Sequence, residues 1–307
     1  MPCSAIATSV PQLLSINHKT VYRYQRPVGF REHRAMFRPR DSHDLRVIDA
    51  QLTLSPPGKV RWIHDVFSNS IAVITFEQEA DELRFESWIE IENYGLHEPS
   101  FPIRSDAATY PFRYDNDQVV DLLPTLQCHY PDPEGALSAW ARQFVEPGGI
   151  DTQELLVRIT RAIKAQFEYQ RRAIRGTQAP TETLALGSGT CRDFALLMIE
   201  AVRSLGMAAR FVTGYLYDPS IDPSIDNASE GLVGTGATHA WVQVYLPGAG
   251  WVEFDPTNGL VGGAHLIRVA VARDPRQAIP LYGSYRGYAS DFIDMQVTVR
   301  VTAGERR

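Results

Sequence analysis

The sequence predicts an α+β protein, in which a β-rich N-terminal part precedes a part that combines helices with strands. From Leu14 to Ile103, short runs of strand-forming residues follow one another, separated by Pro-Gly, Ser-Asn and acidic turns. Beyond residue 133, apolar residues recur at helical spacing in several segments. Two aromatic-rich runs around residues 247–250 then show the pattern of a β-hairpin.

The β-rich part alternates polar and bulky residues, which is typical of antiparallel strands with one buried face. The segments that show this alternation are HKTVYRYQ (18–25), RVIDAQLTLSP (46–56), VRWIHDVFSN (60–69), SIAVITFEQ (70–78) and LRFESWIEIENY (83–94). Short strands at this spacing predict an antiparallel sandwich or barrel.

The C-terminal part follows an irregular, Pro-rich stretch at 104–132, which we interpret as a linker. Helical patterns come next, at 134–145 and 152–167. The core sheet is expected to contain 209–217, the hairpin within 236–259, and the C-terminal MQVTVRVT.

A chain of 307 residues that is 44% hydrophobic can bury a large core and is expected to form two domains. The patterns predict a flexible tail (1–12), an N-terminal β-rich domain (13–104), a linker (105–133) and a C-terminal domain (134–307) that carries the candidate site.

Cys191 stands between a small-residue turn and an apolar segment that has helical periodicity and ends at Gly206. Residues 187–190 (GSGT) do not easily continue a helix backwards, and Thr190 is the candidate N-cap. In the first turn, free N–H groups and the helix dipole favour thiolate over thiol, and they can also hold an oxyanion. Cys191 is therefore a candidate nucleophile. The alternative is a small core residue.

The hairpin brings His239 and Asp255 to the same end, but its register decides whether they share a face. If Tyr245 opposes Trp251, leaving a five-residue loop, the two side chains lie on one face. If Leu246 opposes Trp251, they lie on opposite faces. We expect the first register, in which the carboxylate orients the imidazole. The structural alternatives are a core histidine and an aspartate that starts a turn.

Three segments resemble one known family. GSGTCRDFALLMIEAVRSLGMAARFVTGY (187–215) and THAWVQVYLPGAGWVEFDPTNG (238–259) closely resemble the bacterial transglutaminase-like cysteine enzymes. INHKTVYRYQRPVGFREHRAMFRPR (16–40) resembles the β-rich domain that precedes the catalytic domain in one bacterial branch. The resemblance implies a papain-like core, in which a Cys-bearing helix packs against an antiparallel sheet, after an antiparallel β-sandwich-like N-terminal domain.

Carried over residue by residue, the Cys–His–Asp triad of the family falls on Cys191, His239 and Asp255. Related folds often supply a second oxyanion donor from an aromatic or amide side chain. Tyr169 is the candidate here, and a packing role is its alternative. The implied reaction is attack on a peptide or Gln side-chain amide through a Cys thioester. Water as acceptor gives a peptidase or amidase, which we favour; a primary amine gives a protein-glutamine amine transferase. A catalytically silent peptide- or protein-binding module and a Cys–His–Asp acetyltransferase are the rival classes.

The composition argues against several other classes of protein. A formal net charge of −6 gives no general attraction to nucleic acid or anionic membranes, and no apolar run reaches the roughly 18 residues of a membrane span. The first residues lack the pattern of a signal peptide, and three cysteines are too few for a disulfide framework. We therefore expect a bacterial cytoplasmic enzyme whose partner is a peptide or protein substrate. The oligomeric state stays open.

No cofactor or metal is predicted. Asp218, Asp222 and Asp226 recur every four residues, but they match no EF-hand loop, and a solvated surface loop is the simpler interpretation. Calcium dependence stays open, since animal transglutaminases need it but no residue here carries that requirement over. Neither a zinc spacing nor a nucleotide-binding loop is present. The loop at 218–236 is a candidate lid over the cleft.

Overall fold

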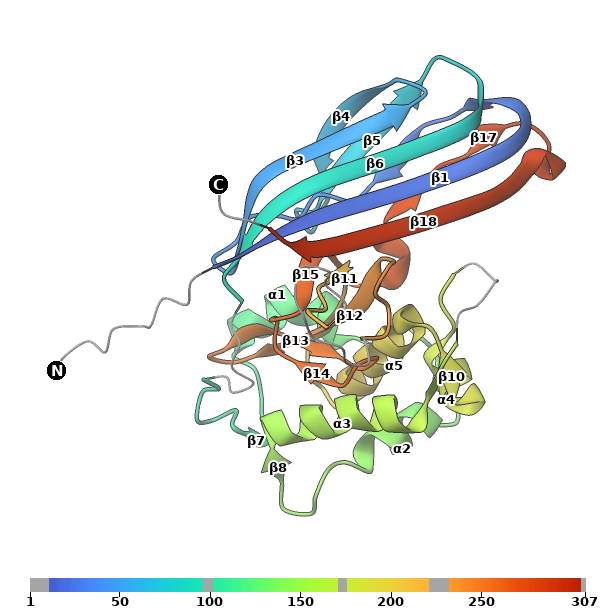
Figure 1. Cartoon of the computed structure of the whole chain (residues 1–307). Coiled ribbons are helices and arrows are strands. Elements are labelled where there is room, and N and C mark those ends of the chain that lie inside the picture. The colour runs from blue at the N-terminus through green and yellow to red at the C-terminus, as the bar shows by residue number, and fades with distance from the viewer. Residues whose placement is uncertain (1–10, 96–101, 171–175, 221–231, 305–307) are drawn as a thin grey trace.

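The computed structural model describes residues 11–95, 102–170, 176–220 and 232–304 (Figure 1). The fold is α+β, as predicted: a β-sandwich that contains the N-terminal strands lies against a second part built from five α-helices and a five-stranded sheet. Residues 1–10 of the expected tail lie outside the described residues. The predicted domain boundaries stay predictions.

The sandwich consists of two antiparallel sheets. The larger sheet has the strand order β17-β1-β6-β3, and β18 pairs with β1. Its strands are β1 (Gln12–Phe30), β3 (Leu45–Ser55), β6 (Ala80–Asn93), β17 (Tyr285–Arg286) and β18 (Phe292–Ala303). The smaller sheet has the order β16-β2-β5-β4. Its strands are β2 (His33–Ala35), β4 (Gly58–His64), β5 (Ser70–Phe76) and β16 (Leu281–Tyr282).

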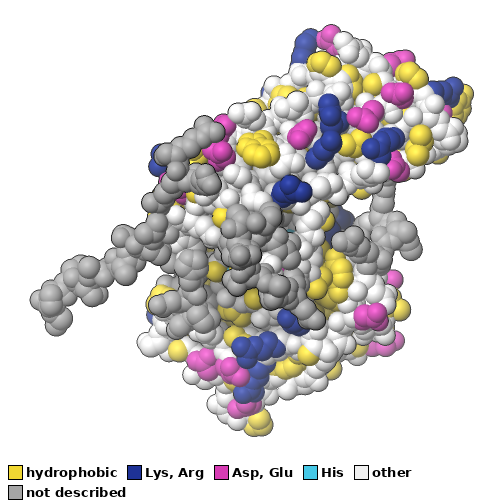
Figure 2. Space-filling model, viewed as in Figure 1, with side chains coloured by type: hydrophobic (Ala, Val, Ile, Leu, Met, Phe, Trp, Pro, Cys, Tyr) yellow, Lys and Arg dark blue, Asp and Glu magenta, His cyan; other side chains and the backbone are white. Residues whose placement is uncertain are grey.

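The alternation in the sequence decides which face of each strand is buried. On β6, Leu83, Phe85 and Ile89 are fully buried and Ser87 shares their face, whereas Arg84, Glu86 and Trp88 face outward. The outer face carries charges of both signs, interspersed over the β-rich part in Figure 2. Cross-strand pairs such as Arg23 with Glu82, at 3.8 Å, lie on this solvated face.

β18 lies in the sandwich, so the prediction that MQVTVRVT joins the core sheet is wrong. The register pairs Ile16 with Val301 and His18 with Val299, and the valines of β18 belong to the large apolar cluster that also contains Ile16 and residues of the core sheet. The core sheet instead takes β15 (Leu266–Ala272) as its edge strand. An amphipathic strand of period two fits the edge of either sheet, so the alternation in the sequence does not choose between them.

Removing residues 292–307 is expected to lower the free energy of unfolding by several kcal/mol, because β1 then loses its whole pairing with β18 and exposes an unpaired edge. Chemical denaturation and hydrogen exchange of the β1 amides measure the loss. Deletion of residues 305–307 alone is the control. Unchanged protection of the β1 amides in the longer truncation would contradict this role of β18.

The second part is built on an antiparallel sheet with the order β14-β13-β12-β11-β15. The remaining strands of this sheet are β11 (Ala209–Leu216), β12 (His239–Leu246), β13 (Gly250–Asp255) and β14 (Leu260–Val261). The helices are α1 (Asn116–Leu126), α2 (Ala136–Arg142), α3 (Thr152–Gln166), α4 (Pro180–Leu186) and α5 (Cys191–Ser204). The short elements are β7 (Thr109–Tyr110), β8 (Ile150–Asp151), β9 (Glu168–Tyr169), β10 (Ser188–Gly189), and the 3₁₀ turns η1 (Pro275–Gln277) and η2 (Ala289–Asp291).

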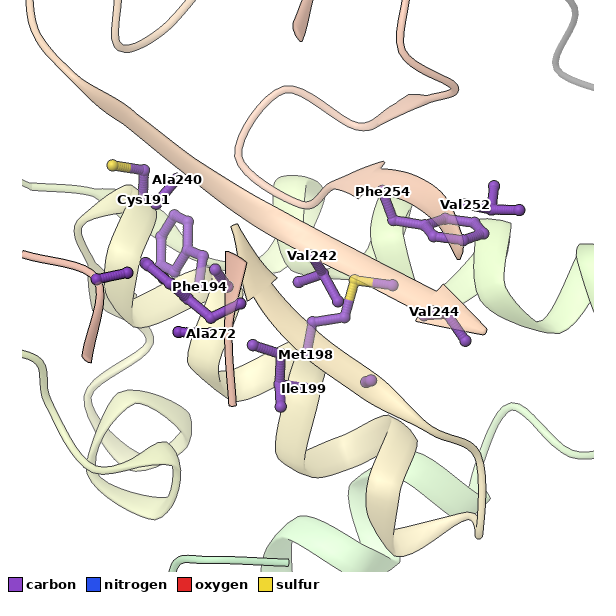
Figure 3. Close-up of a cluster of buried hydrophobic side chains, with 14 of the residues drawn as sticks. Cys191, Phe194, Met198, Ile199, Ala240, Val242, Val244, Val252, Phe254 and Ala272 are labelled. Atoms are coloured by element: carbon purple, nitrogen blue, oxygen red, sulfur yellow. The ribbon is translucent and has the colours of Figure 1, made fainter. Parts of the chain in front are cut away.

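Helix α5 packs its apolar face against the core sheet. Phe194, Met198 and Ile199 of the helix meet inward side chains of β12 and β13, including Val242 and Phe254 (Figure 3). Each of these side chains is at most 1% exposed. The helix is therefore held along its length, and its first residue is fixed at one end of the sheet.

The predicted helices at 134–145 and 152–167 are confirmed, the first over fewer residues than expected. The expectation of irregular chain at 104–132 is wrong at α1. Helix α1 carries a capping box between Asp115 and Gln118 and buries Leu122. Pro124, in its last turns, suggested a loop, although a proline late in a helix is compatible with the turns that precede it.

Candidate functional site

Cys191 is the first residue of α5, and its thiol is at the edge of the buried core. Thr190 is the N-cap, as predicted, and its backbone N–H donates to Asp193 Oδ2 at 2.8 Å. The other carboxylate oxygen of Asp193 accepts the backbone N–H of Gln178 at 2.7 Å. Cys191 is 8% exposed, and its sulfur points away from the apolar cluster at the start of the helix (Figure 3). The turn thus holds the thiol at a helix N-terminus.

The hairpin brings the predicted histidine and aspartate together. Tyr245 pairs with Trp251, which is the expected register, although Leu246 also pairs with Gly250 and shortens the loop to three residues. His239 Nε2 donates to Asp255 Oδ2 at 2.9 Å, and both side chains are fully buried. The shared face that the sequence predicted is therefore the observed one.

Further donors fix the carboxylate of Asp255. The backbone N–H of Thr257 donates to Oδ1 at 2.9 Å, and Asn258 Nδ2 donates to Oδ2 at 2.8 Å. Burial alone would raise the pKa of Asp255, but the charge of His239 and these donors outweigh it and lower the pKa. Asp255 therefore both starts the turn and holds the imidazole. The role of Asn258 was missed, because DPTNG reads only as a turn.

The second ring nitrogen of His239 is not used by the bond to Asp255. Nδ1 is buried and has no hydrogen-bond partner among the described residues, and a side chain on Gly234 would begin 2.6 Å from it. Burial lowers the pKa of His239, but the charge and hydrogen bond of Asp255, followed by the interaction with Cys191, raise it to about 10. Because Nε2 is bonded to Asp255, Nδ1 is the nitrogen that is left to interact with Cys191. The structure thus brings His239 and Asp255 into contact, and the role of Cys191 beside them stays a prediction.

Tyr169 lies beside the turn that precedes α5. It pairs with Gly189 in the parallel β9–β10 ladder, and its ring packs edge-to-face on Phe194 at 6.4 Å. This placement is near the start of the helix and satisfies the packing role that we considered as its alternative. The oxyanion role of Tyr169 stays a prediction.

The candidate lid at 218–236 is described in part, since Asp222, Asp226 and Gly231 lie outside the described residues. Asp218 accepts hydrogen bonds from Ser220 and from the backbone of Leu232, and so closes the base of this loop. Within the described ranges, no three His, Cys, Asp or Glu side chains gather as a metal site would require. In the same ranges, none of the helices combines the length and the apolarity of a membrane crossing.

Comparison with known proteins matches two family models. Residues 138–256 match the transglutaminase-like superfamily, and residues 14–92 match the bacterial transglutaminase-like N-terminal region. An uncharacterized protein of Mycobacterium tuberculosis is 27% identical over 297 residues, covering 92% of this chain and 91% of its own length. One from Mycobacterium leprae is 26% identical, covering 94% of this chain and 98% of its own.

Among solved structures, a candidate cysteine protease from Cytophaga hutchinsonii superimposes with a TM-score of 0.69. The match covers 97% of this chain and 93% of the other, at 19% sequence identity. At that identity the likeness is one of fold. It extends over the sandwich as well as over the part that carries Cys191.

Proposed function

Because this chain belongs to the transglutaminase-like superfamily through residues 138–256, we propose that it is a cysteine enzyme that acts on peptide or Gln side-chain amides. One observation carries the proposal: the imidazole of His239 is 2.9 Å from a buried carboxylate, and its pKa is raised further by the thiol at the N-terminus of α5. In this assignment Cys191 is the nucleophile, His239 the base and Asp255 the residue that orients the base.

The reaction proceeds through a thioester. His239 Nδ1 holds the proton of Cys191, and the thiolate sulfur attacks the carbonyl carbon of the amide to form a C–S bond. The backbone N–H of Cys191 stabilises the oxyanion, with Tyr169 as the proposed second donor. The C–N bond then breaks as His239 gives its proton to the leaving nitrogen. The amine departs, and the acyl group remains on sulfur.

The acceptor decides the class of the product. His239 takes a proton from the incoming water or amine while the acceptor attacks the thioester carbon, and the C–S bond breaks to return the thiolate. Water gives hydrolysis of a peptide or of a Gln side chain, whereas a primary amine gives an isopeptide or substituted amide. We place hydrolysis first and amine transfer second. The bacterial cytoplasm stays the predicted location.

Alkylation of Cys191 by iodoacetamide, followed across pH by peptide mass spectrometry, tests the Cys–His pair. Cys128 is the internal reference, because its side chain is exposed to the reagent. The pKa of its thiol is raised by partial desolvation and by the charge of Glu200. At pH 6 we expect Cys191 to react at least about tenfold faster than Cys128, and this advantage to disappear in His239→Ala. Equal rates for the two thiols would instead favour the catalytically silent module.

The acceptor is tested with β-casein in the presence and absence of dansylcadaverine. New peptide termini or a Gln-to-Glu mass change indicates hydrolysis, whereas a fluorescent adduct on Gln indicates transfer. Cys191→Ala is the control for both products. If Cys191 is reactive but neither product forms, the Cys–His pair is supported, and the proposal that the enzyme acts on peptide or Gln side-chain amides is contradicted.

A further inference from the structure

The sheet face that carries His239 bears a second set of buried polar groups. On β12, His239, Trp241 and Gln243 share this face, whereas Ala240 and Val242 face α5. On β13, Glu253 lies on the same face as Asp255, and both are buried. A buried charge that the proposed reaction does not use needs another explanation.

Trp241 is the side chain next to the imidazole on this face. Its ring stacks beside that of His239, with centroids 6.1 Å apart and planes at 25°. The indole is fully buried, and it lies over Gly214 of β11, where a Cβ would come within 2.8 Å of the ring. A side chain at that position would collide with the indole, which stacks on the imidazole. The position of the imidazole therefore depends on where the indole is held.

Glu253 holds the indole. Its carboxylate accepts a hydrogen bond from Trp241 Nε1, another from Gln243 Nε2 at 2.7 Å, and a third from Arg268 Nη1 at 2.9 Å. Gln243 is itself fixed, because its amide oxygen accepts from Arg210 Nε at 2.7 Å. All three groups that contact the carboxylate are donors, which favours the ionised form, because a protonated carboxyl would find no acceptor for its O–H among them. Burial raises the pKa of Glu253, and the charge of Arg268 opposes that rise.

The same network reaches the sandwich. Arg268, on β15, places Nη2 3.4 Å from Asp44 Oδ1, and Asp44 directly precedes β3. Burial would raise the pKa of Asp44, but the charge of Arg268 lowers it overall. An unbroken chain of charged and aromatic contacts therefore joins the N-terminal strands to the imidazole.

We propose that Glu253 is a positioning residue, which fixes the His239 imidazole through Trp241 and is itself held by Arg268 and Asp44. This inference rests on the proposed function, because it assigns the ring that Glu253 fixes to catalysis. If Glu253 has this role, the N-terminal sandwich contributes a residue to the contacts around the candidate site. Its Asp44 completes the set of contacts that keeps the base in place.

The test compares Glu253→Gln with Glu200→Gln. Glu200 is a matched control, since it is also buried, pairs with Arg203 at 2.7 Å and accepts the backbone N–H of His129 at 2.8 Å, but it has no contact with Trp241. Long-range ¹H–¹⁵N spectra of ¹⁵N-histidine protein follow the titration of His239, whose signals are identified by their loss in His239→Ala. The rate of Cys191 alkylation across pH is the second measurement.

In Glu253→Gln we expect the alkylation rate of Cys191 at pH 6 to fall about tenfold to a hundredfold, because a displacement of about 1 Å has effects of this size. The His239 titration should move toward the ordinary histidine range. Asp44→Asn should shift both measurements in the same direction by less. In Trp241→Phe, adding Glu253→Gln should change little further, because the residue that transmits the effect is gone.

A purely structural role predicts a different pattern. Glu253→Gln and Glu200→Gln would then lower the unfolding temperature alike, and neither would move the His239 titration; that result overturns the inference. If Glu253→Gln fails to fold, an unchanged titration in both Asp44→Asn and Trp241→Phe overturns it equally. Failure of the proposed function is distinct, because wild-type Cys191 would then react no faster than Cys128.

Discussion

Replacing Cys191 by alanine is expected to lower turnover by a factor on the order of 10⁴ to 10⁶ and to leave the fold intact. In the proposed reaction, the thiol at the start of α5 forms the covalent bond to the acyl group. The substitution removes a single sulfur atom at the edge of the core, where Cys191 is still 8% exposed. Packing therefore changes little, whereas the thioester can no longer form.

Mass spectrometry of the intact protein and of its tryptic peptides, after acid quenching of a peptide reaction, measures this effect directly. Wild type should carry the acyl mass on the tryptic peptide that contains Cys191, and Cys191→Ala should carry none. Cys128→Ala is the matched control, since it removes the exposed thiol and should leave both the acyl mass and turnover unchanged. An acyl adduct that survives in Cys191→Ala would remove the thiol from the mechanism.

Replacing Asp255 by asparagine should lower turnover by about 10² to 10⁴, because the imidazole loses the carboxylate that fixes its tautomer. The 2.9 Å bond to His239 Nε2 is fully buried, so no water takes over the role. The charge of Asp255 is also the largest influence that raises the pKa of His239. The His239 titration should therefore fall well below its wild-type position, and NMR of labelled histidine measures it.

The same substitution should lower the free energy of unfolding by about 3–5 kcal/mol, since it leaves one member of a buried pair without its partner. The size of this loss should depend on pH. The raised pKa of His239, about 10, gives stabilisation that is complete below pH ~6.5 and is lost as the pH rises toward 10. The lowered pKa of Asp255 gives stabilisation that is present above pH ~4 and is lost in more acidic solution.

The difference in unfolding free energy between wild type and Asp255→Asn should therefore be largest between about pH 4 and 6.5. Urea titrations at several pH values measure it. A difference that stays constant from pH 4 to 10 would show that the pair contributes through packing and not through charge. That outcome would also contradict the raised pKa of His239.

The location of the site could be predicted from the sequence because its signals are local. A small-residue turn before an apolar helix places Cys191, and a hairpin pattern places His239 and Asp255 at one end of two strands. The choice between two hairpin registers was also correct, with Tyr245 opposite Trp251. Each of these inferences uses only residues of a single helix with its preceding turn, or of a single hairpin.

The rest depends on contacts between distant segments. Nothing near Met295 shows that β18 pairs with β1 rather than with the core sheet, because both edges accept an amphipathic strand. In the sequence WVEF, Glu253 is a single polar residue on a strand. The role proposed for it depends on Arg268, which contacts it, and on Asp44, which contacts Arg268; both lie on other segments of the chain. Buried polar networks of this kind are invisible to periodicity, which counts only apolar positions.

The position of β18 in the sequence also determines when, during translation, β1 can pair with it. β1 emerges first from the ribosome, but its partner β18 follows only after the core sheet and its five helices have been made. Domains generally fold as the chain appears, so the part with Cys191 can fold while one edge of the larger sheet is still open. The nascent sandwich is therefore exposed to wrong pairing for most of translation, and β18, when it arrives, covers that edge.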